Sequence, residues 1–362
     1  MRRWAGVGAL AMLALGACRM PGQKCATPDS MRAKLAGQPN ADTLADLGIL
    51  LANEKQYACA ANAFSASLKL KPDSENVLFM FGTSLFFAGN AEEAVAPLQA
   101  AEQIEGRNLK THLLLGAVHD QLHRFDEAKR EWQAALDADP ESTEALDGLA
   151  QDYVQAQEFG AAIALLENPR AERQRTATQS LSLGMAYAGT GKLDAAIGAL
   201  RDGLNTTPES AALVNALEDM LVQAGRVEDA SVVFGVARAR HPEDVETGLH
   251  FLRLLMASDP EKAKPVGEEL LQAFPKSWET RYLNGVLAME EQDFARARLY
   301  LSQSIALNAE FAMAHSALGV VLARLNDLEG AKAELERAIA LGDTSPEVQE
   351  NLERVTRANA RQ

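Results

Sequence analysis

The chain has 362 residues and a formal net charge of −15, from 50 Asp and Glu against 35 Lys and Arg. This acidic balance argues against a nucleic-acid binder, because such proteins normally present a basic face, and against broad attachment to anionic lipid. Solubility of a long open surface would account for the charge, and a basic protein partner is the alternative. The length would allow several globular domains, but the repeats described below predict one elongated array.

The first eighteen residues are typical of a secretory signal. Met1-Arg2-Arg3 precedes an apolar run from Trp4 to Leu15, which is too short to span a membrane, and small residues follow it. The sequence Leu15-Gly16-Ala17-Cys18 resembles the signal of bacterial lipoproteins. The resemblance implies that residues 1–17 are removed and that lipid is added to Cys18. The alternative is ordinary cleavage after Ala17, with Cys18 left unmodified.

The residue after Cys18 bears on the membrane that would hold the chain. In Gram-negative lipoproteins an aspartate at that place retains the protein in the inner membrane, whereas this chain has Arg19. The resemblance therefore implies a location in the cell envelope, lipid-anchored at the outer membrane and facing the periplasm. Residues 18–40 are expected to form a lipid-anchored leader.

Two further cysteines follow the anchor. Cys25 lies in the leader and Cys59 in the expected second helix of the first repeat. In an oxidising compartment they could form a disulfide that fastens the leader to the repeat. Two independent thiols are the alternative, because the sequence does not give the distance between them.

A pattern of small and large residues recurs every 34 residues. A small residue is followed after 12 positions by alanine, and after 16 by a large apolar residue. The small residues are Gly48, Gly82, Gly116, Ala150 and Gly184, and the large ones are Phe64, Leu98, Trp132, Leu166 and Leu200. A fixed period of this length predicts stacked helical units that bury their apolar faces against their neighbours.

Residues 109–142 illustrate one unit. Leu115 and Gly116 lie on one face of the expected first helix, where a small residue lets two helices approach closely. Ala128, Trp132 and Ala135 form the buried stripe of the second helix. Asp139-Pro140 ends that helix, because proline lacks the amide hydrogen and disfavours helix in the residue before it.

These motifs resemble the tetratricopeptide repeat (TPR) family. Leu183, Gly184, Tyr187, Ala196, Leu200 and Pro208 match its pattern in one unit. The resemblance covers residues 41–345 as nine units, which start near 41, 75, 109, 143, 177, 211, 245, 278 and 312. It implies an all-α fold, a right-handed α-solenoid of about nine helix-turn-helix units. Residues 346–362 are expected to add a C-terminal capping helix.

Three departures from the pattern are expected to alter the structure locally. Pro169 should end the second helix of unit four near Glu167, so the array is expected to be irregular near residues 167–179. The stretch from Arg170 to Gln179 would then be a longer connector, and a bend is expected there. Unit seven is one residue short, most simply in its Ser258-Asp259-Pro260 turn. Unit six has Glu218 where a small residue is expected. Arg170, Arg173 and Arg175 of the connector are interpreted as solvated loop residues, with an acidic partner as the alternative.

No motif for catalysis stands out. The closest is His119-Asp120-Gln121-Leu122-His123, which resembles the His-Glu-x-x-His helix of zinc peptidases but has aspartate in place of glutamate. His112, seven residues upstream, would make a three-histidine set. Because His112 and His119 occupy ordinary packing positions of the repeat, they are interpreted as structural. No catalytic residue, metal site or cofactor is predicted.

The first helices of the family line a concave groove, so surplus apolar residues there indicate a binding surface. The groove residues expected to bind a peptide are Phe79, Met80, Phe86, Phe87, Leu113 and Leu114, with Tyr282, Leu283 and Met289 in a second patch. The alternative is that the first patch buries against the leader or unit one. The lysine and asparagine clamp of chaperone-binding members is absent, since Ala45 and Ile49 stand at matching positions.

These features predict an envelope-anchored TPR scaffold or adaptor, not an enzyme. It would bind protein or peptide partners in its groove, by apolar anchors with basic residues between them, for assembly or regulation of envelope machinery. One alternative is a metal-dependent hydrolase or enzyme accessory subunit that uses His119 and His123. Another is a structural spacer without a specific ligand.

Overall fold

The computed structural model describes residues 25, 28–35, 39–106, 108–167 and 174–360. The predicted signal peptide, the lipid acceptor Cys18 and Arg19, and the connector residues Arg170 and Arg173 lie outside these residues. Within them every regular element is a helix, as the sequence predicts, and none of the helices is long and apolar enough to cross a membrane.

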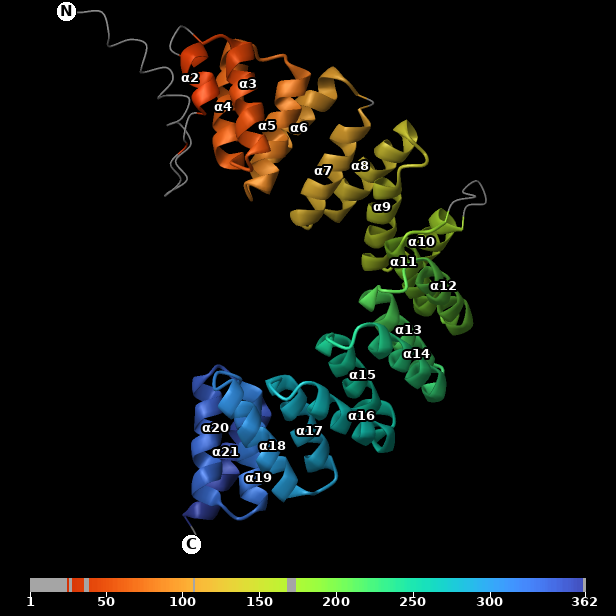
Figure 1. Cartoon of the computed structure of the whole chain (residues 1–362), viewed down its shortest axis with the longest axis vertical. Coiled ribbons are helices and arrows are strands. Elements are labelled where there is room, and N and C mark those ends of the chain that lie inside the picture. The colour runs from red at the N-terminus through yellow and green to blue at the C-terminus, as the bar shows by residue number, and fades with distance from the viewer. Residues whose placement is uncertain (1–24, 26–27, 36–38, 107, 168–173, 361–362) are drawn as a thin grey trace, which may run out of the picture. The chain divides into compact units, whose positions relative to one another are not determined.

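The chain divides between Thr190 and Gly191 into two compact units, called unit A and unit B below. Unit A contains α2 (Asp29–Leu35), α3 (Ala41–Asn53), α4 (Tyr57–Leu70), α5 (Glu75–Phe87), α6 (Ala91–Ile104), α7 (Leu109–Gln121), α8 (Phe125–Ala138), α9 (Thr143–Gln155), α10 (Phe159–Leu166) and α11 (Ala177–Gly189) (Figure 1). Unit B contains α12 (Leu193–Thr206), α13 (Ala211–Gln223), α14 (Val227–Arg240), α15 (Val245–Ser258), α16 (Pro260–Ala273), α17 (Trp278–Glu290), α18 (Phe294–Leu307), α19 (Ala312–Arg324), α20 (Leu328–Ala340) and α21 (Pro346–Asn359).

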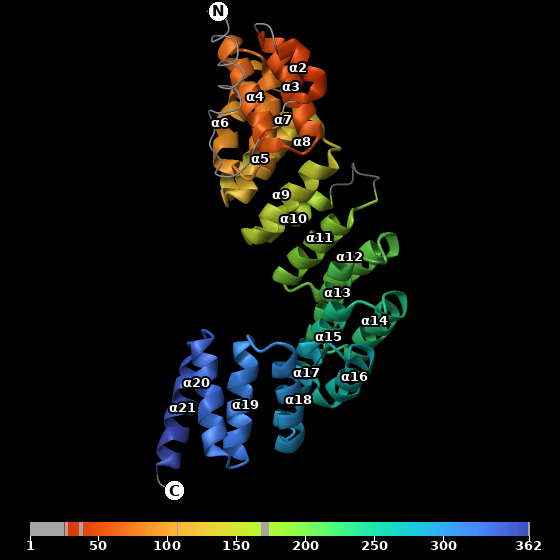
Figure 2. The same cartoon turned by 60° about the vertical axis from the view of Figure 1, so that its left-hand side comes forward.

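The helices from α3 to α20 follow the predicted repeat. Each odd-numbered helix from α3 to α19 begins at the residue where the sequence predicts a repeat to start, and an even-numbered helix follows it in the chain. Within each unit the helices stack side by side, which a second direction of view also shows (Figure 2). The odd-numbered helices are called first helices below, and the even-numbered ones second helices.

A single left-handed residue makes the tight turn inside most pairs. Positive φ recurs at Lys55, Gly89, His123, Gln157, Gly191, Gly225, Gln292 and Asn326. The backbone amide of each C-terminal turn then bonds back to a helix carbonyl, for example His123 N to Asp120 O at 2.9 Å. The seventh repeat (α15 and α16) lacks this left-handed residue, since Asp259 both ends α15 and caps α16, with φ −150°. The residue missing from unit seven is therefore the turn residue, at the place that the sequence predicts.

In most first helices a small residue makes room for the large residue 16 positions later. A Cβ atom added to Gly116 would lie 2.6 Å from the Trp132 ring, and one added to Gly48 would lie 2.6 Å from the Phe64 ring. The same relation joins Gly285 to Leu301, at 2.7 Å. Contacts this close show why the period is strict, because a side chain at the small position would push the two helices apart.

The leader contains structure that the repeat pattern does not predict. Helix α2 buries Met31 and Leu35 against Leu44, Leu47 and Phe64 of the first pair in one apolar cluster. A short helix that covers the open face of the first repeat acts as an N-terminal cap. At the other end α21 buries Val348 and Val355, as the sequence predicts for a capping helix.

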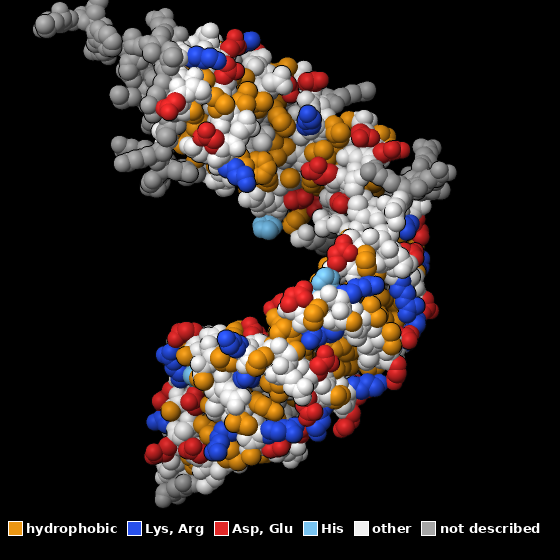
Figure 3. Space-filling view, viewed as in Figure 1, with side chains coloured by type: hydrophobic (Ala, Val, Ile, Leu, Met, Phe, Trp, Pro, Cys, Tyr) orange, Lys and Arg blue, Asp and Glu red, His pale blue; other side chains and the backbone are white. Residues whose placement is uncertain are grey.

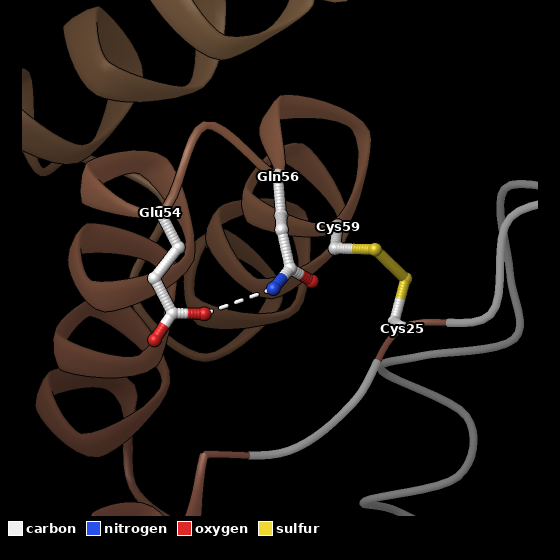
Figure 4. The surroundings of a disulfide bond; sticks show 4 residues. All are labelled: Cys25, Glu54, Gln56 and Cys59. Carbon is white, nitrogen blue, oxygen red and sulfur yellow. Dashed lines mark hydrogen bonds between the residues drawn. A yellow bond between two sulfur atoms is a disulfide. The ribbon is translucent and has the colours of Figure 1, made fainter.

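A disulfide joins the leader to the first repeat. Cys25 and Cys59 are bonded, with their Cα atoms 5.6 Å apart, and Cys59 is buried in α4 (Figure 4). Nearby, Gln56 Nε2 donates to Glu54 Oε2 at 2.8 Å. The bond closes a separation of 34 residues. By the chain-entropy model such a closure contributes about 3–4 kcal/mol to stability.

The irregular segment after α10 is shorter than predicted. Helix α10 ends at Leu166 with Glu167 as its cap, which confirms the early end expected from Pro169. Helix α11 begins at Ala177, however, because Thr176 and Gln179 form a capping box that starts the helix inside the expected connector. The guanidinium of Arg175 donates to Leu166 O, with Nε and Nη2 each at 3.3 Å, so Arg175 is tied to the end of α10. A bend at this place stays a prediction.

Candidate functional site

The first helices line the concave face of each unit. In unit A contacts run along the row from α3 to α5, α7, α9 and α11, and in unit B from α13 to α15, α17, α19 and α21. Among the described residues, no second helix packs closely on the next second helix. The more closely spaced layer is the inner side of a curved stack. Each unit therefore presents its first helices on a concave face, as the family resemblance implies.

The apolar surplus of α5 is divided between packing and exposure. Phe79 and Phe86 are partly buried and pack against the cluster that contains Leu85 and Leu98. Phe87 is 57% exposed, and its ring centroid lies 5.2 Å from that of Tyr57 and 5.5 Å from that of Phe86. Hydrophobic side chains gather over α4–α6 on the face seen in Figure 3. Phe87 is thus the side chain of this group that a ligand could cover without disturbing the core.

The other predicted groove residues of unit A are half-buried. Met80 packs against the cluster that also holds Met31 and Leu35 of α2. Leu114 packs against the same cluster as Phe79, and Leu113 against the cluster around Trp132. Part of the apolar surplus of this region therefore serves packing, and of these three residues Met80 packs in the cluster shared with the leader and the first repeat, as in the alternative interpretation.

The second predicted patch lies in unit B. Tyr282 and Met289 pack against the core cluster of the last repeats, and the Tyr282 ring meets Phe311 edge-on at 4.9 Å between centroids. Burial, and to a lesser degree the charge of Asp343, raises the pKa of Tyr282. Leu283 is only 7% exposed, so it can contribute little to a surface. Met313, on α19, is the more exposed apolar side chain of this region, at 54%.

The buried carboxyl group of Asp152 and the partly exposed one of Asp120 meet between α7 and α9. The Trp132 Nε1 group donates to Asp120 Oδ2 at 3.3 Å, and Asp152 of α9 is 3% exposed. Burial first, and then the charge of Asp120 and a hydrogen bond with it, raises the pKa of Asp152 to about 7. Burial also raises the pKa of Asp120. Two carboxylates so close cannot both ionise freely, so the pair holds a proton near neutral pH.

The sequence motif from His119 to His123 contains Asp120, but no sequence motif pointed to Asp152. The two residues are 32 positions apart on successive first helices. Both residues lie near the C-terminal end of their helices, and this shared position was the signal in the sequence that they could be neighbours. Only the packing of α7 on α9 decides that their carboxyl groups meet.

The histidines of the peptidase-like motif do not form a metal site. His119 is 3% exposed, and burial lowers its pKa. His123 lies in the turn at φ 57° and packs its ring 5.9 Å from that of Phe125. In the part of the chain that the structure describes, one group of three His, Cys, Asp or Glu side chains has converging ligand atoms. Neither His119 nor His123 belongs to that group. The structure therefore gives no support to a hydrolase built on His119 and His123.

Unit B holds a shallow pocket of about 230 Å³ between α13, α14 and α15. Its lining includes Arg238, His241 and Asp244. The Arg238 side chain already bonds to Pro242 O at 2.7 Å and to Glu269 Oε1 at 3.3 Å. Since the charge most able to attract a ligand is engaged, the pocket is a weak candidate for a small-molecule site.

Two family models match parts of the chain. The model described as "Tetratricopeptide repeat" matches residues 113–168, 148–211 and 282–346. The model described as "Anaphase-promoting complex, cyclosome, subunit 3" matches residues 53–131. No curated protein sequence matches the chain. Repeats of the first kind generally mediate protein–protein interaction and are typically not enzymes.

Solved structures resemble the chain in fold. A tetratricopeptide repeat protein from Parabacteroides merdae ATCC 43184 is 14% identical with a TM-score of 0.50, over 78% of this chain and 98% of that one. MamA from Desulfovibrio magneticus RS-1 is 20% identical, with a TM-score of 0.43, over 47% and 97%. The pilF protein of Pseudomonas aeruginosa is 18% identical, with a TM-score of 0.43, over 57% and 95%.

Proposed function

We propose that this chain, a tetratricopeptide-repeat protein, is an envelope-anchored scaffold that binds protein or peptide partners on the concave face of its first helices. It would gather partners for the assembly or regulation of envelope machinery. The partner segment would have at least one apolar anchor and a basic residue near it.

The exposed aromatic group at the end of α5 carries the proposal. Phe87 keeps more than half of its surface in water, although Tyr57 and Phe86 lie beside it. Covering a large aromatic side chain releases about 25 cal/mol for each Å² removed from water. Aromatic side chains also concentrate the binding energy of protein interfaces. A row of first helices with such an anchor suits an extended or helical peptide.

The carboxyl pair of Asp120 and Asp152 supports a basic residue in the partner. The pair retains a proton because its two negative charges are unfavourable together in a buried site. A lysine or arginine of a partner that approached the partly exposed Asp120 would take the place of that proton. Binding would then release a proton and would strengthen as the pH rises through about 7.

Replacing Phe87 with glutamate is expected to remove partner capture, because the change puts a charge where the apolar anchor would dock. Partners would be cross-linked in intact cells, captured through a tag on the chain and quantified by mass spectrometry. The captured amount of a groove-bound partner should be at least about 10-fold lower for Phe87→Glu than for the unchanged chain. This corresponds to about 1.4 kcal/mol of binding free energy.

Leu70→Glu is the matched control, since Leu70 is 55% exposed on the second helix α4 of the same unit. Partners that are captured by Leu70→Glu but not by Phe87→Glu would support binding in the groove of the first helices. Equal capture by both variants and the unchanged chain would overturn it, and a chain that captures nothing would indicate a structural spacer. Phe79 and Phe86 are left unchanged, because alanine there would disturb the core.

The envelope location rests on the N-terminal sequence and on the disulfide. The Leu15-Gly16-Ala17-Cys18 sequence resembles a lipoprotein signal. The bonded pair of Cys25 and Cys59 suits an oxidising compartment, where disulfides persist. Several acyl chains, at about 0.8 kcal/mol for each buried methylene, would anchor the protein stably.

Cys18→Ser is expected to release the chain from the membrane fraction, because serine offers no thiol for lipid addition. Fractionation of cells and the mass of the N-terminal peptide would be compared with those of the unchanged chain. Cys25→Ser is the control, since it breaks the disulfide and leaves the lipid acceptor in place. An unmodified N-terminal peptide together with the same distribution of all three chains would rule out the anchor.

A further inference from the structure

The carboxylates of Glu102 and Glu131 converge with the ring of His112 at the junction of the second and third repeats. The three residues come from α6, α8 and α7 of unit A, and one ligand atom from each lies within 4.8 Å of the other two. His112 is 4% exposed, while Glu102 and Glu131 are partly exposed. His112 Nδ1 lies 2.8 Å from Glu131 Oε2.

A second histidine–glutamate pair in unit B shows what the repeat needs for packing alone. His315 and Glu334 occupy the same repeat positions, again 19 residues apart, and His315 Nδ1 lies 2.6 Å from Glu334 Oε2. The other ring nitrogen of His315 bonds to Ala309 O at 3.1 Å. Ile305 stands at the position that corresponds to Glu102. The His315 pair is thus completed by protein groups and has no third ligand.

The site at His112 differs from the pair at His315 both in its number of ligands and in their protein partners. Glu102 brings a second carboxylate, and no hydrogen bond or ion pair of Glu102 is found among the residues that the structure describes. The basic side chains of α8 are engaged elsewhere, Lys129 with Glu158 at 2.7 Å and Arg130 with Glu127 at 3.6 Å. Two carboxylates beside one imidazole therefore leave an excess of negative charge that a cation would balance.

We propose that Glu102, His112 and Glu131 bind one divalent transition-metal ion of the Zn²⁺ type. An imidazole nitrogen with carboxylate oxygens suits Zn²⁺ better than Mg²⁺ or Ca²⁺, which prefer oxygen ligands alone. Zinc bonds to these atoms are about 2.0–2.2 Å long, so the ligand atoms must close to within about 4 Å of one another. Rotation of the partly exposed Glu102 side chain supplies that small change.

Three protein ligands leave room for water to complete the coordination. The ion would tie α6 of the second repeat to both helices of the third, so its role would be to fasten two repeats together. This inference does not depend on the proposed partner groove, because none of the three residues belongs to it.

Zinc titration of the untagged, chelator-treated protein tests the site, with a chromophoric chelator as competitor. One ion per chain is expected, together with a rise in the midpoint of thermal unfolding. Glu102→Gln should weaken zinc binding by at least about 10-fold, because it removes a direct ligand. His112→Gln should do the same, and Glu102→Gln remains informative if the buried His112 variant fails to fold.

Glu334→Gln is the matched control, since it alters the same repeat position at the pair that lacks a third ligand. It should keep the stoichiometry and affinity of the unchanged chain. The proposal is overturned if the folded wild-type chain binds no stoichiometric zinc, or if Glu102→Gln binds zinc as the wild-type chain does. It is also overturned if Glu334→Gln weakens binding as much as Glu102→Gln.

Discussion

Replacing Trp132 with alanine is expected to destabilise the repeats from α7 to α10 by about 3–5 kcal/mol, the range measured when large aromatic side chains are removed from protein cores. Trp132 is 4% exposed. A Cβ atom on Gly116 or Gly148 would lie 2.6 Å or 2.5 Å from its ring. The indole thus fills the space between α7 and α9 that the two glycines leave open, and no neighbouring side chain can take its place.

The loss would be local, because repeat proteins are stabilised by contacts between neighbours. Thermal unfolding followed by circular dichroism would show a lower midpoint or a first separate transition. Hydrogen exchange should accelerate in α7, α8 and α9 before other helices. Trp132→Phe is the control, since it keeps a smaller ring in the same space while it removes the bond to Asp120, and it should cost less. Equal midpoints for the alanine variant and the unchanged chain would contradict this account of the core.

Glu218 is expected to make the stability of unit B fall as the pH rises. The side chain is fully buried, and neither carboxylate oxygen has a hydrogen-bond partner among the described residues. Burial, and then the charge of Asp219, raises the pKa of Glu218 from 4.5 to about 9. The folded chain therefore keeps a proton that the unfolded chain releases above pH 4.5.

The sign follows from this difference in bound protons. Below pH 4.5 both states hold the proton, so stability is greatest there with respect to this group. Between pH 4.5 and about 9 the folded state binds more protons, and stability falls by about 1.4 kcal/mol for each pH unit. By pH 7 the loss is about 3 kcal/mol relative to pH 4.5.

Glu218→Gln should flatten this dependence, because glutamine fills the same space without ionising. Urea unfolding at several pH values between 5 and 8.5 would measure it. Asp202→Asn, an exposed carboxylate on α12, should keep the slope of the unchanged chain. If Glu218→Gln loses stability with pH as steeply as the unchanged chain does, Glu218 is not the group responsible.

The predicted starts of the repeats agree with the structure. The 16-residue spacing of Gly116 and Trp132 is visible in the sequence and matches their contact in the structure. The shortness of the seventh repeat is also visible in the sequence, and in the structure it corresponds to a missing turn residue. Such features are local, because the faces of a helix and the turn between two helices depend on residues close together in the chain. Helix α2 was missed because a single short helix has no period to reveal it.

The sequence by itself determined the helical repeat, its register, its terminal capping helix and the apolar character of the first helices. Only the tertiary structure decided which of those apolar residues remain exposed, such as Phe87, and which are used in packing, such as Phe79. It also decided that Asp120 meets Asp152 and that Glu102 meets His112 and Glu131. Periodicity assigns a residue to a face of its helix, whereas the meeting of two side chains depends on how closely neighbouring helices pack, and that distance is set by the whole interface between them.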